Sequence, residues 1–173
     1  MRSQKATSML IGLAALTLAA IAMFTPRAGF AAGENPDVLE VRHYALTLEK
    51  AEKTATAMQA INQLVASNPS LSAAMDASSS TTGKKPITQQ AQDIDSQYPQ
   101  VAAIIHSNGL ATREFIVITG AIINDVGFVG LKKQGLIQAY PAGSITPANA
   151  ALVEQNWDAF QALAAKMSPP SSR

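Results

Sequence analysis

Asparagines on otherwise apolar helix faces are the residues of this sequence that point most clearly to a site. Asn62, Asn149 and Asn156 each occupy a position where leucine would pack. A buried amide is tolerated only when it is hydrogen-bonded, so these side chains need partners. Two interpretations stay open: the amides bridge helices and fix their register, or they line a small pocket between helices. The candidate residues for this pocket or buried polar network are Asn62, Tyr98, Asp125, Asn149, Asn156 and Trp157.

The other reactive side chains form no recognisable catalytic or metal-binding pattern. His43 and His106 have no second ligand-type residue at the spacing of one helical turn, and a G-x-S-x-G elbow is absent. Asp93 and Asp95 are two positions apart on a predicted helix, so they point to different sides. The chain has no cysteine, which excludes covalent haem and thiolate-bound metals. We therefore expect no catalytic residues, no metal and no cofactor, and the protein is predicted not to be an enzyme.

The first 31 residues have the layout of a secretory signal peptide. Arg2 and Lys5 give a basic start, an apolar run follows over residues 9–24, and Gly29 and Ala31 are the small residues that a signal peptidase requires. An uncleaved N-terminal anchor is the alternative. We therefore expect a periplasmic or secreted protein, with cleavage after Ala31.

Removal of the signal changes the charge of the chain. Arg2, Lys5 and Arg27 leave with it, so the 13 basic residues fall to 10 against 12 acidic ones, a net charge of −2. That balance does not favour binding to nucleic acid or to an anionic membrane. Without disulfides, packing alone must hold the domain together, and a chain of this length suffices for a core.

Residues 113–134 form the most apolar stretch of the mature chain. Apolar side chains cover more than half of its helical wheel, which predicts a nearly enclosed helix. A strand and a membrane span are the rivals, because the stretch is rich in β-branched residues and approaches the length of a span. Asn124 and Asp125 near its middle disfavour a span, and its length disfavours a strand. We therefore predict no stable membrane span after signal cleavage.

Three amphipathic helices are predicted around this central one. They cover residues 47–67, 88–107 and 146–167, with Thr47 and Thr146 as caps and a kink or brief break near Tyr98, before Pro99. Thr112 is the expected cap of the central helix, with Glu114 and Ala111 as an alternative, incomplete capping box. The sequence thus predicts an all-α, four-helix bundle-like domain over residues 47–167. The remaining segments are a leader over residues 32–46, a long loop over residues 76–86 after a single turn, and a disordered tail over residues 168–173.

Several short patterns resemble those of uncharacterised small exported all-helical proteins of Gram-negative bacteria. They are Tyr44-Ala45-Leu46-Thr47, Asn108-Gly109-Leu110 followed by Glu114-Phe115, and Thr146-Pro147-Ala148-Asn149 followed by Asn156. The resemblance implies an exported helical domain and carries no catalytic residue or ligand with it.

Two functions are compatible with these observations. One is a non-catalytic exported domain that binds a protein partner, as an accessory or envelope-stress factor. The other is a carrier of a small apolar ligand in a pocket between helices, with Trp157 in its wall.

Overall fold

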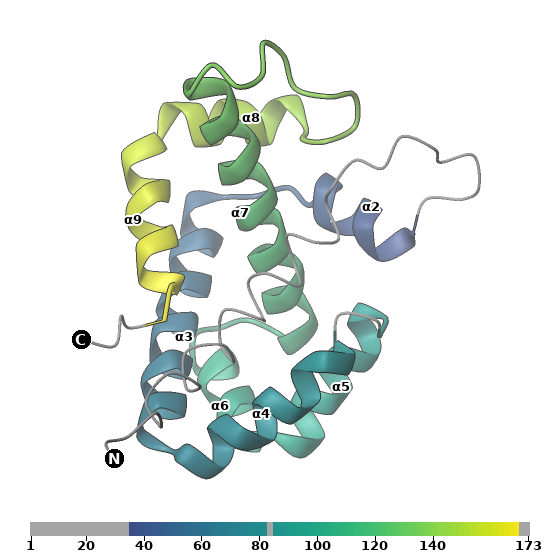
Figure 1. The fold of residues 1–173 in the computed structure, drawn as a ribbon, viewed down its shortest axis with the longest axis vertical. Coiled ribbons are helices and arrows are strands. Elements are labelled where there is room, and N and C mark those ends of the chain that lie inside the picture. Colours follow the sequence, from purple (N-terminus) through teal and green to yellow (C-terminus); the bar gives the residue numbers. More distant parts are fainter. Residues whose placement is uncertain (1–34, 83–84, 170–173) are drawn as a thin grey trace, which may run out of the picture.

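A computed structural model describes residues 35–82 and 85–169, and these residues form eight helices and no strand (Figure 1). The helices are α2 (Pro36–His43), α3 (Leu48–Ser67), α4 (Pro69–Thr82), α5 (Ile87–Gln97), α6 (Pro99–Ser107), α7 (Thr112–Lys133), α8 (Pro147–Gln155) and α9 (Trp157–Met167). The predicted all-α class is confirmed. The predicted signal peptide at residues 1–31 and the end of the predicted tail, residues 170–173, lie outside the described residues.

Helix α7 runs through the middle of the molecule and is contacted by α2, α3, α5, α6, α8 and α9 (Figure 1). The predicted central helix is therefore confirmed, with each end within one residue of the prediction. By length and composition α7 could cross a membrane, a test that the core helix of a soluble protein also passes. Ten of its 22 residues are buried, so it is less enclosed than predicted.

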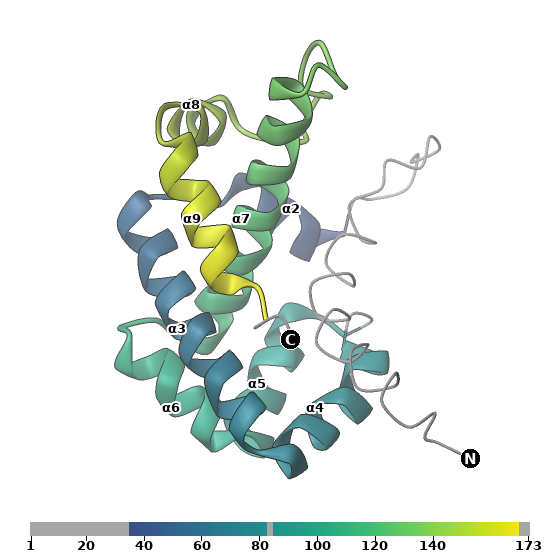
Figure 2. The same ribbon diagram turned by 60° about the vertical axis from the view of Figure 1, so that its left-hand side comes forward.

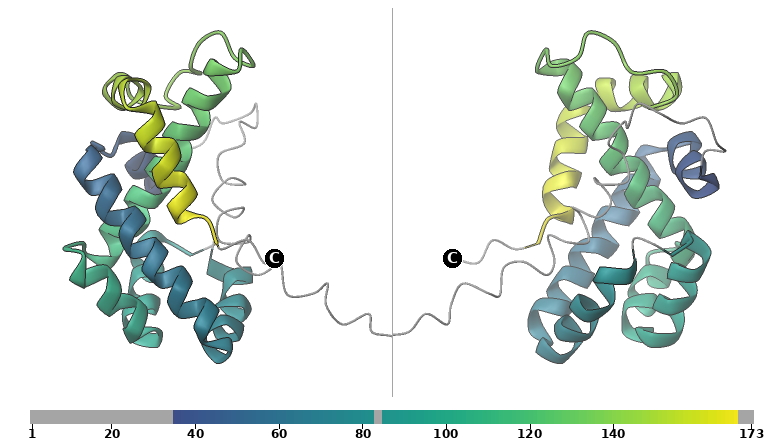
Figure 3. Two further views of the ribbon diagram at one scale, coloured as in Figure 1. Left: turned by 90° about the vertical axis from the view of Figure 1, so that its left-hand side faces the viewer. Right: turned by 45° about the vertical axis from the view of Figure 1, so that its right-hand side comes forward.

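The other helices form two groups around α7. Helices α3 and α9 pack against each other and against α7, and α8 crosses the end of α7 (Figures 1 and 2). At the opposite end lie α4, α5 and α6 (Figure 3). The main core joins both groups, and Ile105, Ile118 and Phe160 are completely buried in it. Burial of one such side chain stabilises the fold by roughly 1.5–3 kcal/mol.

Helix α2 corrects the prediction of a leader without regular structure. The Asn35 side chain accepts a hydrogen bond from the backbone N–H of Asp37 at 3.0 Å, and Pro36 fills the first helical position. On α7, Arg113 forms a two-pronged ion pair with Glu40 of α2. Val41 is the only buried residue of α2. A helix of eight residues with one buried side chain shows no apolar repeat in the sequence, so this helix was not predicted.

Helix α4 corrects the prediction of a long loop over residues 76–86. The Asn68 side chain accepts a hydrogen bond from the backbone N–H of Leu71 at 3.1 Å, and the helix then continues to Thr82. Serine and threonine are only modest helix formers, but they do not terminate a helix that has a capped start. The prediction gave too much weight to composition in this segment.

Two breaks turn the predicted long helices into pairs. The break predicted at Tyr98 is confirmed, because Tyr98 leaves helical geometry between α5 and α6. The second break, at Asn156, was not predicted: it separates α8 from α9, which runs in a different direction (Figure 1). The described residues therefore contain eight helices where the sequence predicted four principal ones.

Candidate functional site

Asp125 and Asn149 meet in the interior and form the centre of a buried polar network. Asn149 Nδ2 donates to Asp125 Oδ2 at 2.8 Å and to the backbone carbonyl of Tyr44 at 2.9 Å. Asn149 Oδ1 accepts from the backbone N–H of Leu46 at 3.2 Å. One amide side chain on α8 thus uses both N–H groups and its oxygen to join α7 to the connection between α2 and α3.

Asn124 extends this network to the loop between α7 and α8. Its Nδ2 donates to Asp125 Oδ1 at 2.9 Å and to the backbone carbonyl of Ser144 at 2.8 Å. Both partners are acceptors, so the amide nitrogen must face them and the orientation of the side chain is determined. Asn124 Oδ1 is left buried without a hydrogen-bond partner. Asn124 and Ser144 were not among the predicted site residues, although Asn124 is adjacent to Asp125.

The Asp125 carboxyl lies in an environment that disfavours its charge. It is completely buried, and this loss of solvation raises its pKa to about 6, although the hydrogen bonds from Asn124 and Asn149 act in the opposite direction. A carboxyl with this pKa could exchange a proton near neutral pH. Because it is shielded from solvent and bonded to two amides, its evident role is to hold three segments together.

The structure separates the other three predicted polar residues from Asp125 and Asn149. Asn62 is buried between α3 and α9, where its Nδ2 donates to the backbone carbonyl of Met167 at 3.1 Å. Asn156 lies at the break between α8 and α9, and its side chain turns back to the carbonyl of Leu152 on α8 at 2.9 Å. Tyr98 is at the other end of the molecule, and its hydroxyl donates to the carbonyl of Ala74 at 3.2 Å.

Trp157 lies at the start of α9, against the C-terminal end of α7. A side-chain carbon at Gly130 would come within 3.3 Å of the Trp157 ring, so the glycine gives the ring room to approach. The ammonium of Lys133 lies 5.3 Å from the ring centroid, within range of a cation–π interaction. The Trp157 side chain is half-buried. The structure shows no contact between it and the buried network of Asp125 and Asn149.

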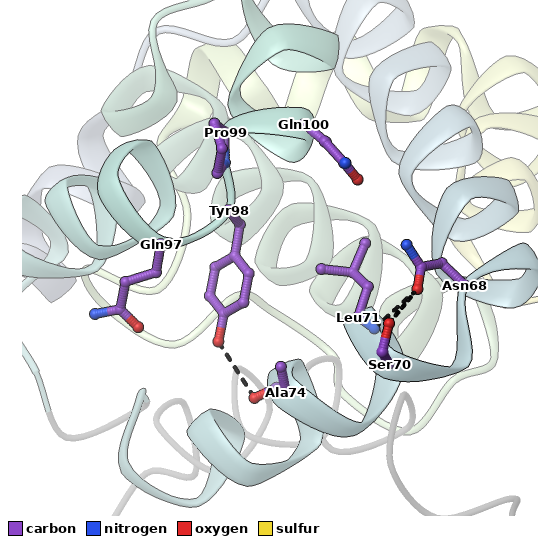
Figure 4. Close-up of a pocket in the computed structure, with 8 residues that line it drawn as sticks. All are labelled: Asn68, Ser70, Leu71, Ala74, Gln97, Tyr98, Pro99 and Gln100. Carbon is purple, nitrogen blue, oxygen red and sulfur yellow. Dashed lines mark hydrogen bonds between the residues drawn. The ribbon is translucent and has the colours of Figure 1, made fainter.

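Two shallow hollows lie outside the buried network. The first, of about 300 Å³, lies where the α3–α4 and α5–α6 breaks face each other, and Tyr98 lines it (Figure 4). Its polar lining consists of neutral groups such as Asn68, Gln97 and Gln100. The second, of about 500 Å³, lies between the α7–α8 loop and α8. It is lined by Tyr140, Pro141, Ala142, Gly143, Ile145, Pro147, Ala150, Ala151 and Glu154.

A cluster of Tyr44, Lys50 and Glu114 ties α3 to the start of α7. Lys50 Nζ donates to Glu114 Oε1 at 2.6 Å and to the Tyr44 hydroxyl at 2.7 Å. The hydrogen bond from Lys50 lowers the pKa of Glu114, while partial burial raises the pKa of Tyr44. A phenol with a raised pKa is a poor general base or nucleophile, so this cluster is suited to joining helices.

A second cluster, of Asp95, His106 and Thr112, contains the residue types of a hydrolytic triad. The Thr112 hydroxyl donates to Asp95 Oδ1, and His106 Nε2 lies 3.1 Å from the same hydroxyl oxygen. Because the hydroxyl proton points to Asp95, His106 must donate to Thr112 rather than take its proton. The prediction that Thr112 caps α7 is wrong: the cap position is Ala111, and the Thr112 hydroxyl joins α7 to α5.

The end of α7 and most of the loop that follows form an exposed region that we call the tip, residues 131–143. Among the described residues, the only two large hydrophobic side chains that are exposed are here, Leu131 at 38% and Leu136 at 66%. Glu154 of α8 borders the tip and accepts from Lys132 at 2.8 Å and from the Tyr140 hydroxyl at 2.5 Å. Exposed large apolar side chains that gather at one end of a molecule are typical of a contact surface.

Comparison with known proteins gives no further guide. No protein-family model, no curated protein and no solved structure matches the chain. Within the part of the chain that the structure describes, no three His, Cys, Asp or Glu side chains gather in a way that could hold a metal ion.

Proposed function

We propose that this chain is an exported, non-catalytic helical domain that acts by binding a protein through its tip. The observation that carries the proposal is the exposure of Leu131 and Leu136 at the same end of the molecule as the hollow of about 500 Å³. Apolar side chains of this size are normally buried, and exposed ones that gather at one place favour an interaction site. The proposed setting is the periplasm or the cell exterior, as an accessory protein of the envelope.

Three further points support this reading. Export is supported by the basic start and apolar run of residues 1–31, which lie outside the described residues. A contact role, as opposed to catalysis, is supported by the polar clusters, because their side chains bond mainly to one another and join helices. A bundle-like body of α3, α7 and α9 with the α5–α6 pair would hold the tip rigidly at one end.

The test is site-specific photo-crosslinking in cells. A photoreactive residue in place of Leu136 should give a defined adduct with an envelope protein, because this side chain is 66% exposed at the proposed surface. The matched control has the same residue in place of Ala103, which is exposed on α6 at the opposite end. Adducts at both positions, or at neither, would contradict a contact site at the tip, and a cytoplasmic location of the chain would contradict export.

The second candidate function is a carrier of a small apolar ligand, favoured by the largely apolar lining of the same hollow. Its openness to solvent makes it the weaker candidate, because carriers enclose most of their ligand's surface. The single tryptophan of the chain lies near the tip, so Trp157 fluorescence should report occupancy. A saturable change in Trp157 fluorescence with a one-to-one apolar ligand, abolished by Ala151→Leu at an exposed position in the hollow, would favour the carrier over the contact domain.

A further inference from the structure

The tip carries an apolar projection and an apolar hollow at the same end of the molecule. Leu136 is the most exposed large hydrophobic side chain among the described residues. Four residues later, Tyr140 and Pro141 begin the lining of the hollow, which continues through Ile145 in the loop to Ala150 on α8. A surface with both a projection and a recess can bind a copy of itself, because each copy supplies what the other lacks.

The charges at the tip are complementary in the same way. Lys132 and Glu154 lie side by side, with Lys132 Nζ 2.8 Å from Glu154 Oε1, and both are partly exposed. In a two-fold arrangement, a lysine and a glutamate on one surface approach the glutamate and the lysine of the other surface. At each edge of the contact, a positive side chain of one copy would then face a negative side chain of the other copy.

We propose that the partner bound by the tip is the tip of a second copy of this chain, related by a two-fold axis. The inference rests on the proposed contact function and names the occupant of that surface. Leu136 of each copy enters the hollow of the other, and Lys132 of each copy faces Glu154 of the other. Such an interface is closed, so it produces a dimer and not a filament.

Other occupants fit the tip less well. A strongly acidic protein or an anionic lipid surface would require a strongly positive tip, but Glu154 forms an ion pair with Lys132 and also interacts electrostatically with Lys133. Lys133 lies over the Trp157 ring, which reduces its availability to an external anion. A self-complementary surface needs both signs of charge, and the tip together with the bordering Glu154 has both.

The first test measures the dimer directly. Sedimentation equilibrium of the purified, exported chain should show a monomer–dimer equilibrium. Leu136→Asp should weaken dimerisation by at least about 30-fold, because it places a carboxylate in an apolar recess at the centre of the contact. The matched control is Ala103→Asp, which adds the same charge at an exposed position of α6 and should leave the equilibrium unchanged.

The second test uses paired charge reversal. Lys132→Glu and Glu154→Lys should each disrupt the dimer, because like charges then meet at both rims. A mixture of the two variants should form a heterodimer. The Glu154→Lys variant has two ammonium groups at the contact and the Lys132→Glu variant has two carboxylates, so opposite charges meet again. The control is the exposed Lys53–Glu49 pair on α3, at 2.7 Å, where Lys53→Glu and Glu49→Lys should change nothing.

Three results would overturn the inference: a chain that stays monomeric up to about 1 mM, a dimer that Leu136→Asp leaves intact, or charge-reversal variants that fail to recover association when mixed. The crosslinking experiment separates this inference from the proposed function. An adduct at position 136 with twice the mass of the chain supports both. An adduct with a different protein supports the contact function and contradicts self-association, and no adduct at all contradicts both.

Discussion

Two regions of α7, six residues apart, have opposite relations to solvent. At Asp125 a charged group is completely buried, and two asparagines bond to it. At Leu131, where the tip begins, large apolar side chains face water. A buried polar group and an exposed apolar group are both departures from ordinary burial, and each requires an explanation. Here the first is explained inside the molecule, by hydrogen bonds between segments, and for the second we propose a partner outside it.

The two regions also differ in how far their contacts reach. The Asp125 network connects residues near positions 44–46, 125, 144 and 149, so it closes long loops of the chain. The tip makes local contacts, mainly between Lys132, Tyr140 and Glu154. Substitutions in the network should therefore affect global stability, while substitutions at the tip should affect association.

The largest effect is expected from Asn149→Leu. This change leaves the Tyr44 carbonyl, the Leu46 amide and one oxygen of Asp125 buried without their partners. We expect the free energy of unfolding to fall by about 3–5 kcal/mol, measured by urea denaturation. Asn156→Ala is the matched control, because that half-exposed amide bonds only to a carbonyl of the preceding helix, and it should cost about 1 kcal/mol or less. Equal losses for the two asparagines would contradict the assigned network.

The next effect is a dependence of stability on pH that comes from Asp125. Its pKa is about 6 in the folded chain and 3.8 in the reference state, so the folded state binds the proton more tightly. Stability should therefore fall as pH rises from about 4 to about 6.5, by roughly 3 kcal/mol in total. No charged neighbour offsets the desolvation that raises the pKa of Asp125, because the hydrogen-bond partners of this carboxyl are two neutral amides.

Asp125→Asn should flatten the stability profile in this window, whatever its effect on stability at a single pH. The lowered pKa values of Glu49, Glu114 and Glu154 act below about pH 4.5 and in the opposite direction, so they do not mask the window. A wild-type profile that is flat between pH 4.5 and 6.5 would show that the Asp125 carboxyl is hydrated.

Parts of the fold could be predicted because their signals are local. The apolar circumference of α7, the Thr47 and Thr146 caps and the break before Pro99 each depend on a few neighbouring residues. The break at Asn156 could not be predicted, because neither proline nor glycine marks it. It coincides with the close approach of Trp157 to Gly130 on α7, a contact between distant segments that leaves no pattern near residue 156.

The buried network could be predicted only in part, for a similar reason. Asn149 was recognisable as a polar residue on an apolar helix face, and Asp125 as an acid near the middle of the most apolar helix; the structure joins them. Their other partners are mainly backbone groups, at Tyr44, Leu46 and Ser144, and a backbone carbonyl or amide has no signature in the sequence. Tyr98 and Trp157 were grouped with them by residue type alone, and they lie elsewhere.

Two glycines of α7 give a smaller, matched test of how tightly each part of the helix is packed. A side-chain carbon at Gly127 would meet nothing within 4 Å, so Gly127→Ala should raise the free energy of unfolding by about 1 kcal/mol through helix propensity. At Gly120 the same carbon would lie 3.0 Å from Val41 of α2, whose branched side chain cannot rotate away easily. Gly120→Ala should therefore lower stability by about 1 kcal/mol. Stabilisation by both changes would show that α2 is loosely docked.

The smallest effect on stability is expected at the tip itself. Leu136→Ala should change the free energy of unfolding by less than about 0.5 kcal/mol, because the side chain is already 66% exposed in the folded chain. Leu163→Ala is the matched control, since that leucine is 5% exposed in the core and its truncation should cost about 2–5 kcal/mol. The comparison must be made at concentrations where the chain is monomeric, because dimerisation adds stability by mass action. A loss at position 136 that grows with protein concentration would then measure the contact itself, and a large loss in the monomer would mean that Leu136 belongs to the core.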